Sequence, residues 1–168
     1  MRWTFSKPEG ATTRFAIPNS YHSKRPEAVD PHGMLNVELK PLKVARFVGQ
    51  LAKRFAPYGL RFGNLLRVNP VVEASIDTSA QMLQRILEDL IHEAFSRSPE
   101  SAELTIRSES AVLEFRIADS GPSVTLEQRA LTEHLALTKR SVERLGGTLW
   151  MESSSRGAVV CFVLPMGN

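Results

Sequence analysis

The chain has 168 residues, of which 42% are hydrophobic, and a formal net charge of +3. This length suits one domain with a short extension, and the apolar content is enough for a core. Lys and Arg are spread through the sequence instead of forming one stripe, which argues against nucleic-acid binding. The longest apolar run, residues 158–164, is too short to cross a bilayer, so we expect a cytoplasmic protein without membrane insertion.

The first 33 residues differ from the rest because they contain Pro8, Pro18, Pro26 and Pro31. Proline removes a helical hydrogen bond and clashes with the preceding turn, so no long helix fits here. We therefore predict a proline-rich arm over residues 1–33 and a folded domain over residues 34–168. One short strand is expected within the arm, at residues 12–17.

The first half of the domain shows a helical pattern followed by strand patterns. Apolar residues that recur at intervals of three and four positions predict a helix over residues 42–55, ended by Pro57 and Gly59. Residues 60–68 and 71–76 are expected to form two strands.

A second helix is predicted next, and its start is marked by a polar pair. Thr78 and Gln81 have the spacing of a capping box, and Pro99 closes the helix. Asp89 and Glu93 are four residues apart, so they lie on one face of this helix.

The second half of the domain reads as two hairpins with a helix between them. That helix is expected over most of residues 125–146 and is stopped by Gly146-Gly147. The single cysteine, Cys161, is expected inside a strand. The predicted strands are residues 102–107, 112–119, 148–152 and 158–164.

These landmarks follow one another in a fixed order: the helix with Asp89 and Glu93, the strand-to-turn segment Asp119-Ser120-Gly121-Pro122-Ser123, and the Gly146-Gly147 stop before the last hairpin. The order resembles the ATP-binding domain of sensor histidine kinases, within the GHKL ATPase family, and the resemblance covers about residues 34–165. It implies an α/β two-layer sandwich, in which a mixed, mostly antiparallel sheet carries about three helices on one face.

The resemblance assigns positions to the two carboxylates of the second helix. Glu93 stands where the family has the asparagine that coordinates magnesium, and Asp89 stands at the earlier position that orients the attacking group. A carboxylate can bind magnesium, so Glu93 is the candidate metal ligand. Two carboxylates beside a triphosphate also repel it. The alternative is a solvated acidic helix face.

Asp119 and Gly121 match the family's Asp-x-Gly-x-Gly box, whose aspartate accepts a hydrogen bond from the adenine amino group. Ser123 replaces the second glycine of that box. The alternative is an ordinary turn after a strand, because Asp-Ser-Gly-Pro is common there.

The family's phosphate-binding glycine segment is missing. Its place is taken by Thr132-Glu133-His134-Leu135, in which His134 either meets a phosphate or is an ordinary surface residue. The mobile lid that precedes this segment in the family is reduced to residues 122–131, which is too short to close over a nucleotide.

We therefore expect a degenerate ATPase domain that acts as a non-catalytic, protein-binding regulatory module. Its vestigial ATP site would consist of Asp89, Glu93, Asp119, Gly121 and His134, with no catalytic residue. We expect no cofactor, or at most weak binding of ATP and magnesium. The expected partners are a sensor kinase, a response regulator, a phosphotransfer protein or a second copy of the chain. The alternatives are the ATP-binding catalytic domain of a sensor histidine kinase and an anti-sigma-type switch protein.

Overall fold

A computed structural model of the chain describes residues 13–16, 38–63, 65–69, 72–98, 100–121, 133–154 and 157–166. The expectations for residues 122–132, which include the reduced lid, Ser123 and Thr132, lie outside these residues. Among the described helices, none combines the length and the apolar character that a membrane span requires.

The centre of the fold is a six-stranded sheet with the strand order β1-β7-β8-β6-β5-β3. Neighbouring strands are antiparallel except for β3 and β5, which are parallel. Two further strands, β2 and β4, form a separate antiparallel pair. The strands are β1 Thr13–Ala16, β2 Lys40–Lys43, β3 Leu65–Val68, β4 Ser75–Thr78, β5 Ser101–Glu109, β6 Val112–Asp119, β7 Thr148–Ser154 and β8 Gly157–Pro165.

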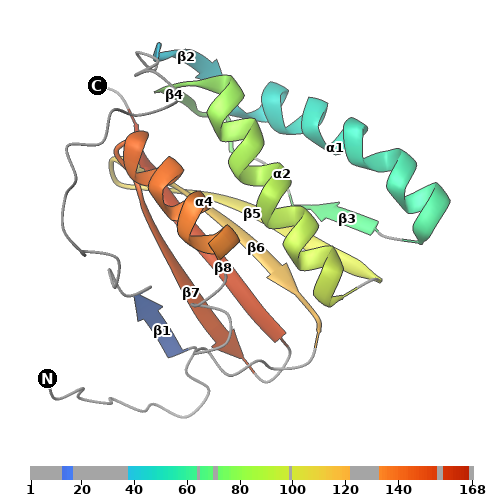
Figure 1. Ribbon diagram of the computed structural model, residues 1–168. Coiled ribbons are helices and arrows are strands. Elements are labelled where there is room, and N and C mark those ends of the chain that lie inside the picture. Colours follow the sequence, from blue (N-terminus) through green and yellow to red (C-terminus); the bar gives the residue numbers. More distant parts are fainter. Residues whose placement is uncertain are drawn as a thin grey trace, which may run out of the picture.

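In the described part of the chain, three helices cover one face of the large sheet (Figure 1). They are α1 Val44–Phe62, which contacts β3, α2 Ala80–Arg97, which lies over β5 and β6, and α4 Glu133–Arg144, which contacts α2 and β7. The predicted two-layer sandwich, with its mixed and mostly antiparallel sheet, is confirmed.

The core forms between the helices and the alternate residues of the central strands. In β6, Leu113, Phe115 and Ile117 are buried and point to the helix layer, as the alternation of a strand requires. Phe115 stacks on Phe162 of β8 with ring centroids 4.6 Å apart. Cys161 is fully buried within β8, as predicted.

The predicted end of the first helix is wrong. The helix continues through Pro57 and Gly59 to Phe62, and it ends at Gly63, which has φ of 75° and donates its N–H to the carbonyl of Gly59. Proline removes one hydrogen bond from a helix, but Pro57 is exposed, so water can solvate the carbonyl left without a partner. The helix therefore tolerates it.

The strands predicted after this helix are also displaced. Residues 60–62 complete α1, so β3 begins only at Leu65, and the next strand is β4 at Ser75–Thr78 instead of residues 71–76. β4 does not join the large sheet but pairs with β2, whose last residues, 42 and 43, were predicted to belong to the first helix.

The predicted start of α2 is off by one residue. Ser79, and not Thr78, is the N-cap, because its Oγ accepts a hydrogen bond from the N–H of Met82 at 3.3 Å. Thr78 belongs to β4, where its Oγ1 is buried without a hydrogen-bond partner. The capping box of Thr78 and Gln81 therefore does not exist, and strand pairing decides the boundary.

The arm and the C-terminal hairpin agree better with the sequence. The short strand expected at residues 12–17 is β1, which pairs antiparallel with β7 from Thr13 opposite Ser153 to Ala16 opposite Trp150. The two predicted hairpins are confirmed as β5–β6 and β7–β8. Gly146, with φ of 77°, follows α4 as the predicted stop.

Candidate functional site

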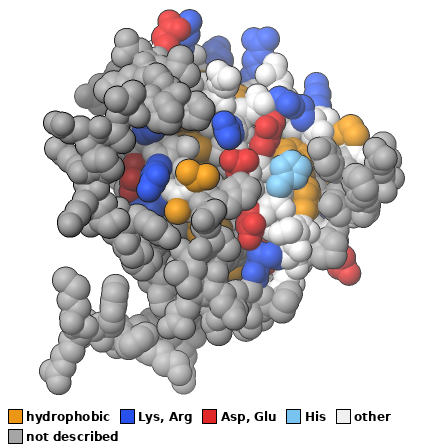
Figure 2. Space-filling view, viewed as in Figure 1, with side chains coloured by type: hydrophobic (Ala, Val, Ile, Leu, Met, Phe, Trp, Pro, Cys, Tyr) orange, Lys and Arg blue, Asp and Glu red, His pale blue; other side chains and the backbone are white. Residues whose placement is uncertain are grey.

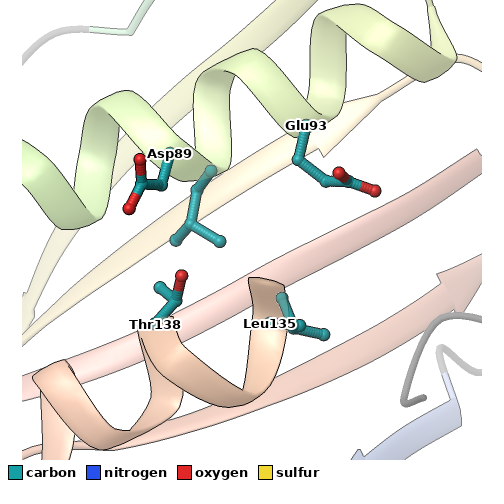
Figure 3. Close-up of a pocket in the computed structure, with 5 residues that line it drawn as sticks. Asp89, Glu93, Leu135 and Thr138 are labelled. Carbon is teal, nitrogen blue, oxygen red and sulfur yellow. The ribbon is translucent and has the colours of Figure 1, made fainter. Parts of the chain in front are cut away.

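The two carboxylates predicted on α2 lie together on the side of the helix that faces α4 (Figure 3). Their spacing of four residues places them one helical turn apart. Between them, Leu90 is buried in the core and fixes the rotation of the helix. Asp89 and Glu93 thereby line a small hollow together with Leu90, Leu135 and Thr138.

This hollow is very small. The cavity that the five described residues bound has a volume of about 10 Å³, which is at the lower limit for a single water molecule. A ligand pocket usually has a volume of roughly 300 Å³ or more. Thr138 of α4, which was not predicted as a site residue, is buried at 3% exposure. The facing helices are therefore packed against each other where phosphates and metal would be expected.

The predicted adenine-binding residue Asp119 lies at the end of β6, beside the last turn of α2. Its carboxylate is only 1% exposed. Oδ2 lies 3.2 Å from Nε of Arg97, and Oδ1 accepts backbone N–H groups from Gly121 at 3.2 Å and Ala158 at 3.5 Å. The carboxylate is thus turned inward and hydrogen-bonded on both oxygens.

Gly121 has a structural reason to be glycine. A Cβ atom at this position would lie 2.6 Å from the backbone carbonyl oxygen of Arg97, closer than non-bonded atoms tolerate. A second link joins the same two segments, since Oγ of Ser98 and Oγ of Ser120 are 2.9 Å apart. The close approach that this glycine allows is therefore between α2 and the end of β6.

Asp89, Glu93 and Arg97 follow one another at intervals of four residues along α2. Each step advances about 6 Å along the helix axis, so one face of α2 connects the acidic hollow with the Asp119 carboxylate. Arg97 was missed in the sequence analysis. Its spacing from Glu93 was the available signal, but its partner Asp119 is 22 residues away and is brought close only by the fold.

His134 falls in the first turn of α4, directly before Leu135, and its side chain lies outside the described residues. Within the described part of the chain, no group of three or more His, Cys, Asp or Glu side chains could hold a metal ion. Figure 2 shows acidic and basic side chains interspersed over the face in view, not one field of a single sign.

The described residues do not fit magnesium and ATP in their present arrangement. The hollow at Asp89 and Glu93 encloses only about 10 Å³ between two carboxylates, and Asp119 already accepts three hydrogen bonds.

Solved structures with the same fold come from histidine kinases. The ATP-binding domain of PrrB from Mycobacterium tuberculosis has a TM-score of 0.69 and 21% identity, over 78% of this chain and 99% of that domain. Full-length ShkA in complex with AMPPNP has a TM-score of 0.69 and 20% identity, over 80% of this chain and 32% of ShkA. ThkA, in its structure with the response regulator TrrA, has a TM-score of 0.68 and 16% identity. The match covers 78% of this chain and 42% of the matched chain in that structure. The TM-scores show that these proteins share the fold of this chain, and at identities this low the comparison shows the fold alone.

A sequence comparison with curated proteins finds no match. The sequence pattern of the family described as histidine kinase-, DNA gyrase B-, and HSP90-like ATPase, in contrast, matches residues 78–168, which are more than half of the chain. This segment contains α2, the Asp119 turn, α4 and the last hairpin. The chain therefore belongs to the histidine kinase-, DNA gyrase B- and HSP90-like ATPase family.

Proposed function

We propose that this chain is a degenerate histidine-kinase-like ATPase domain that serves as a non-catalytic, protein-binding regulatory module in two-component-type signalling. The observation that supports this most directly is the hollow between α2 and α4. It is bounded by the carboxylates of Asp89 and Glu93, and its volume is only about 10 Å³.

The chemistry of this hollow disfavours a nucleotide for two reasons. Carboxylates repel a triphosphate, because like charges within a few Å cost on the order of 1 kcal/mol or more even in water. Magnesium could offset this repulsion, but it binds phosphates in an octahedral shell that keeps several water molecules. The hollow itself encloses only about 10 Å³, which is about the space of one water molecule.

The sequence at the start of α4 supports the same proposal. Backbone N–H groups at a helix N-terminus bind phosphate well, especially where glycines allow close approach. Here residues 132–135 carry no glycine, and Glu133 adds a negative charge to the first turn. His134 remains as a vestigial contact, and Glu93 remains as the vestigial metal position.

The proposed partner is a signalling protein: a response regulator, a sensor kinase or a phosphotransfer protein. The structure of ThkA with the response regulator TrrA supports this class, because a domain with the same fold occurs there in a complex with such a protein. Self-association of two copies is the alternative form of the same binding role.

The second candidate function is the ATP-binding catalytic domain of a sensor histidine kinase. Family membership favours it, and so does the structure of ShkA with the ATP analogue AMPPNP. Against it stands the hollow between α2 and α4, where Leu90 and Leu135 are both buried in the core and leave only about 10 Å³.

Titration calorimetry with magnesium and ATP separates the two candidates. We expect no binding below about 1 mM, whereas a dissociation constant near 1 μM, about −8 kcal/mol, would contradict the proposal and favour the catalytic candidate. The double variant Asp89→Asn with Glu93→Gln should bind inorganic triphosphate more tightly than the wild type. The control Glu109→Gln, which changes an exposed carboxylate on β5, should not bind triphosphate more tightly.

Enrichment of receiver or phosphotransfer proteins by the intact chain, used as bait, tests the partner class.

A further inference from the structure

The last turn of α2 places a cation on the carboxylate at the end of β6. Nε of Arg97 donates to Oδ2 of Asp119 at 3.2 Å, and the two side chains are 14% and 1% exposed. A buried carboxylate that loses its cationic partner is strongly destabilised. Arg97 therefore stabilises the inward position of Asp119, and the pair closes this part of the site without any ligand.

The backbone around the pair leaves little freedom for the carboxylate to turn outward. Gly157 has φ of 126°, and a Cβ atom there would lie 2.1 Å from the carbonyl oxygen of Asp119. The N–H of Ala158 and the N–H of Gly121 both donate to Oδ1 of Asp119. Because these backbone segments are in direct contact, Oδ2 becomes accessible only if the Arg97 side chain moves.

We propose that Arg97 is an internal occupant of the base-binding position, so that it determines which ligands the site rejects. It takes the carboxylate oxygen that an adenine amino group would use in an ATP-binding member of the family. An incoming adenine offers a neutral donor, whereas Arg97 offers a cation, so only Arg97 adds the attraction between opposite charges to its hydrogen bond with the carboxylate. Adenine therefore cannot displace Arg97. This inference rests on the proposed loss of nucleotide binding, and it assigns the rejection of the base to one residue.

The proposal is specific to the base and independent of the phosphates. The acidic hollow at Asp89 and Glu93 acts on the phosphate and metal end of a nucleotide, whereas Arg97 acts on the base. A probe without phosphate therefore isolates the effect of Arg97. Adenosine has the amino group that could donate a hydrogen bond to Asp119, and inosine carries a carbonyl oxygen in place of that group.

The test compares Arg97→Met with the wild type in binding adenosine, followed by ligand-observed NMR and without metal. We expect no adenosine binding by the wild type at 1 mM. Arg97→Met should gain at least about tenfold in affinity for adenosine and nothing for inosine. Adding Asp119→Asn to Arg97→Met should abolish the gain. Arg85→Met, a change at an exposed position of the same helix, is the matched control and should behave as the wild type.

Several outcomes would overturn the proposal. One is a folded Arg97→Met that binds adenosine no better than the wild type, and another is an equal gain for inosine. If thermal unfolding shows that Arg97→Met does not fold, Arg97→Gln replaces it, because this change removes the charge and keeps a polar side chain. Its binding of adenosine and inosine is then compared with that of the wild type. Adenosine binding by the wild type equal to that of the variant also rejects the role of Arg97. Tight binding of magnesium and ATP by the wild type would instead reject the proposed function, so the two failures are distinguishable.

Discussion

Arg116 of β6 pairs with Glu152 of β7 across the intervening strand β8, on the sheet face opposite the helices. Nη2 of Arg116 lies 2.5 Å from Oε2 of Glu152, and Nε1 of Trp150 donates to Oε1 of the same carboxylate at 3.2 Å. Cys161 of β8 lies opposite both Arg116 and Trp150 in the strand register. The pair thus connects two strands that share no backbone hydrogen bonds.

Burial works to lower the pKa of Arg116, but the hydrogen bond to Glu152 and the nearby side chains of Cys161, Glu152 and Glu114 together raise that pKa above its ordinary value. A group whose pKa is raised on folding stabilises the fold below its unfolded pKa, and this contribution is lost only as the pH rises through the folded pKa. Arg116 therefore stays charged, and its contribution to stability is constant, throughout the neutral range.

Arg116→Met should lower the free energy of unfolding by about 2 kcal/mol. Removing one partner of a fully buried pair costs roughly 3 to 5 kcal/mol, and the cost is smaller here because the Arg116 side chain is 22% exposed. Urea denaturation measures the change. Arg107→Met, at an exposed position of β5, is the control. The double variant Arg116→Met with Glu152→Met should recover most of the loss, and a double variant as unstable as the single one would contradict this account.

Ser79→Ala and Thr78→Val should have different effects on stability. Ser79 caps α2 through its bond to Met82, so its loss should cost about 1 kcal/mol. Thr78→Val keeps the shape of a buried side chain and removes a hydroxyl without a partner, so it should be neutral or stabilising. Thermal unfolding of both variants checks this. A larger loss for Thr78→Val would place the cap at Thr78 after all.

Gly157→Ala should destabilise the fold by about 2 kcal/mol or more. The new Cβ would lie 2.1 Å from the carbonyl oxygen of Asp119, and the backbone has φ of 126°, so strain is unavoidable. Gly49→Ala is the matched control. Gly49 is exposed in α1 with nothing within 4 Å, and alanine there should stabilise by about 0.5 to 1 kcal/mol. Similar stability of the two variants in urea denaturation would show that the Gly157 contact is not close.

Glu93→Asn alone should not create kinase activity. The asparagine would restore the metal position, but residues 132–135 would still lack glycine and the hollow beside Leu90 would remain closed. Phosphoryl transfer depends on oriented donors and metal acting together. Incorporation of label from ATP is the measurement, both with the variant alone and with a phosphoacceptor domain added. Transfer by the single variant above the wild-type background would refute the prediction.

Deletion of residues 1–33 should lower the melting temperature and promote self-association. The deletion removes β1, so the edge of β7 from Trp150 to Ser153 loses its paired strand. An unpaired edge offers free N–H and C=O groups to another chain. Deletion of residues 1–11 retains β1 and is the control. Light scattering and thermal unfolding report the two effects. An unchanged melting temperature and mass for the longer deletion would make the arm dispensable.

The layers and most strands of the fold were predictable because their signals are local. Alternation within β6, such as Leu113, Phe115 and Ile117, reports which side of a strand is buried without knowledge of its neighbours. Gly146 likewise signals the end of α4 through its own backbone conformation. Asp89, Glu93, Asp119 and Gly121 could be located for the same reason, since each follows a recognisable element.

Tertiary structure alone decided how these residues are used. Pro57 stays within α1 because that side of the helix is exposed, and Thr78 is drawn from a cap position into β4 by its pairing with Lys40. Arg97 meets Asp119 only because α2 lies over β6. A local pattern states which face of an element is apolar, but it does not state which distant side chain will lie against a given oxygen. That depends on how the layers pack, and this packing placed a cation on the Asp119 carboxylate.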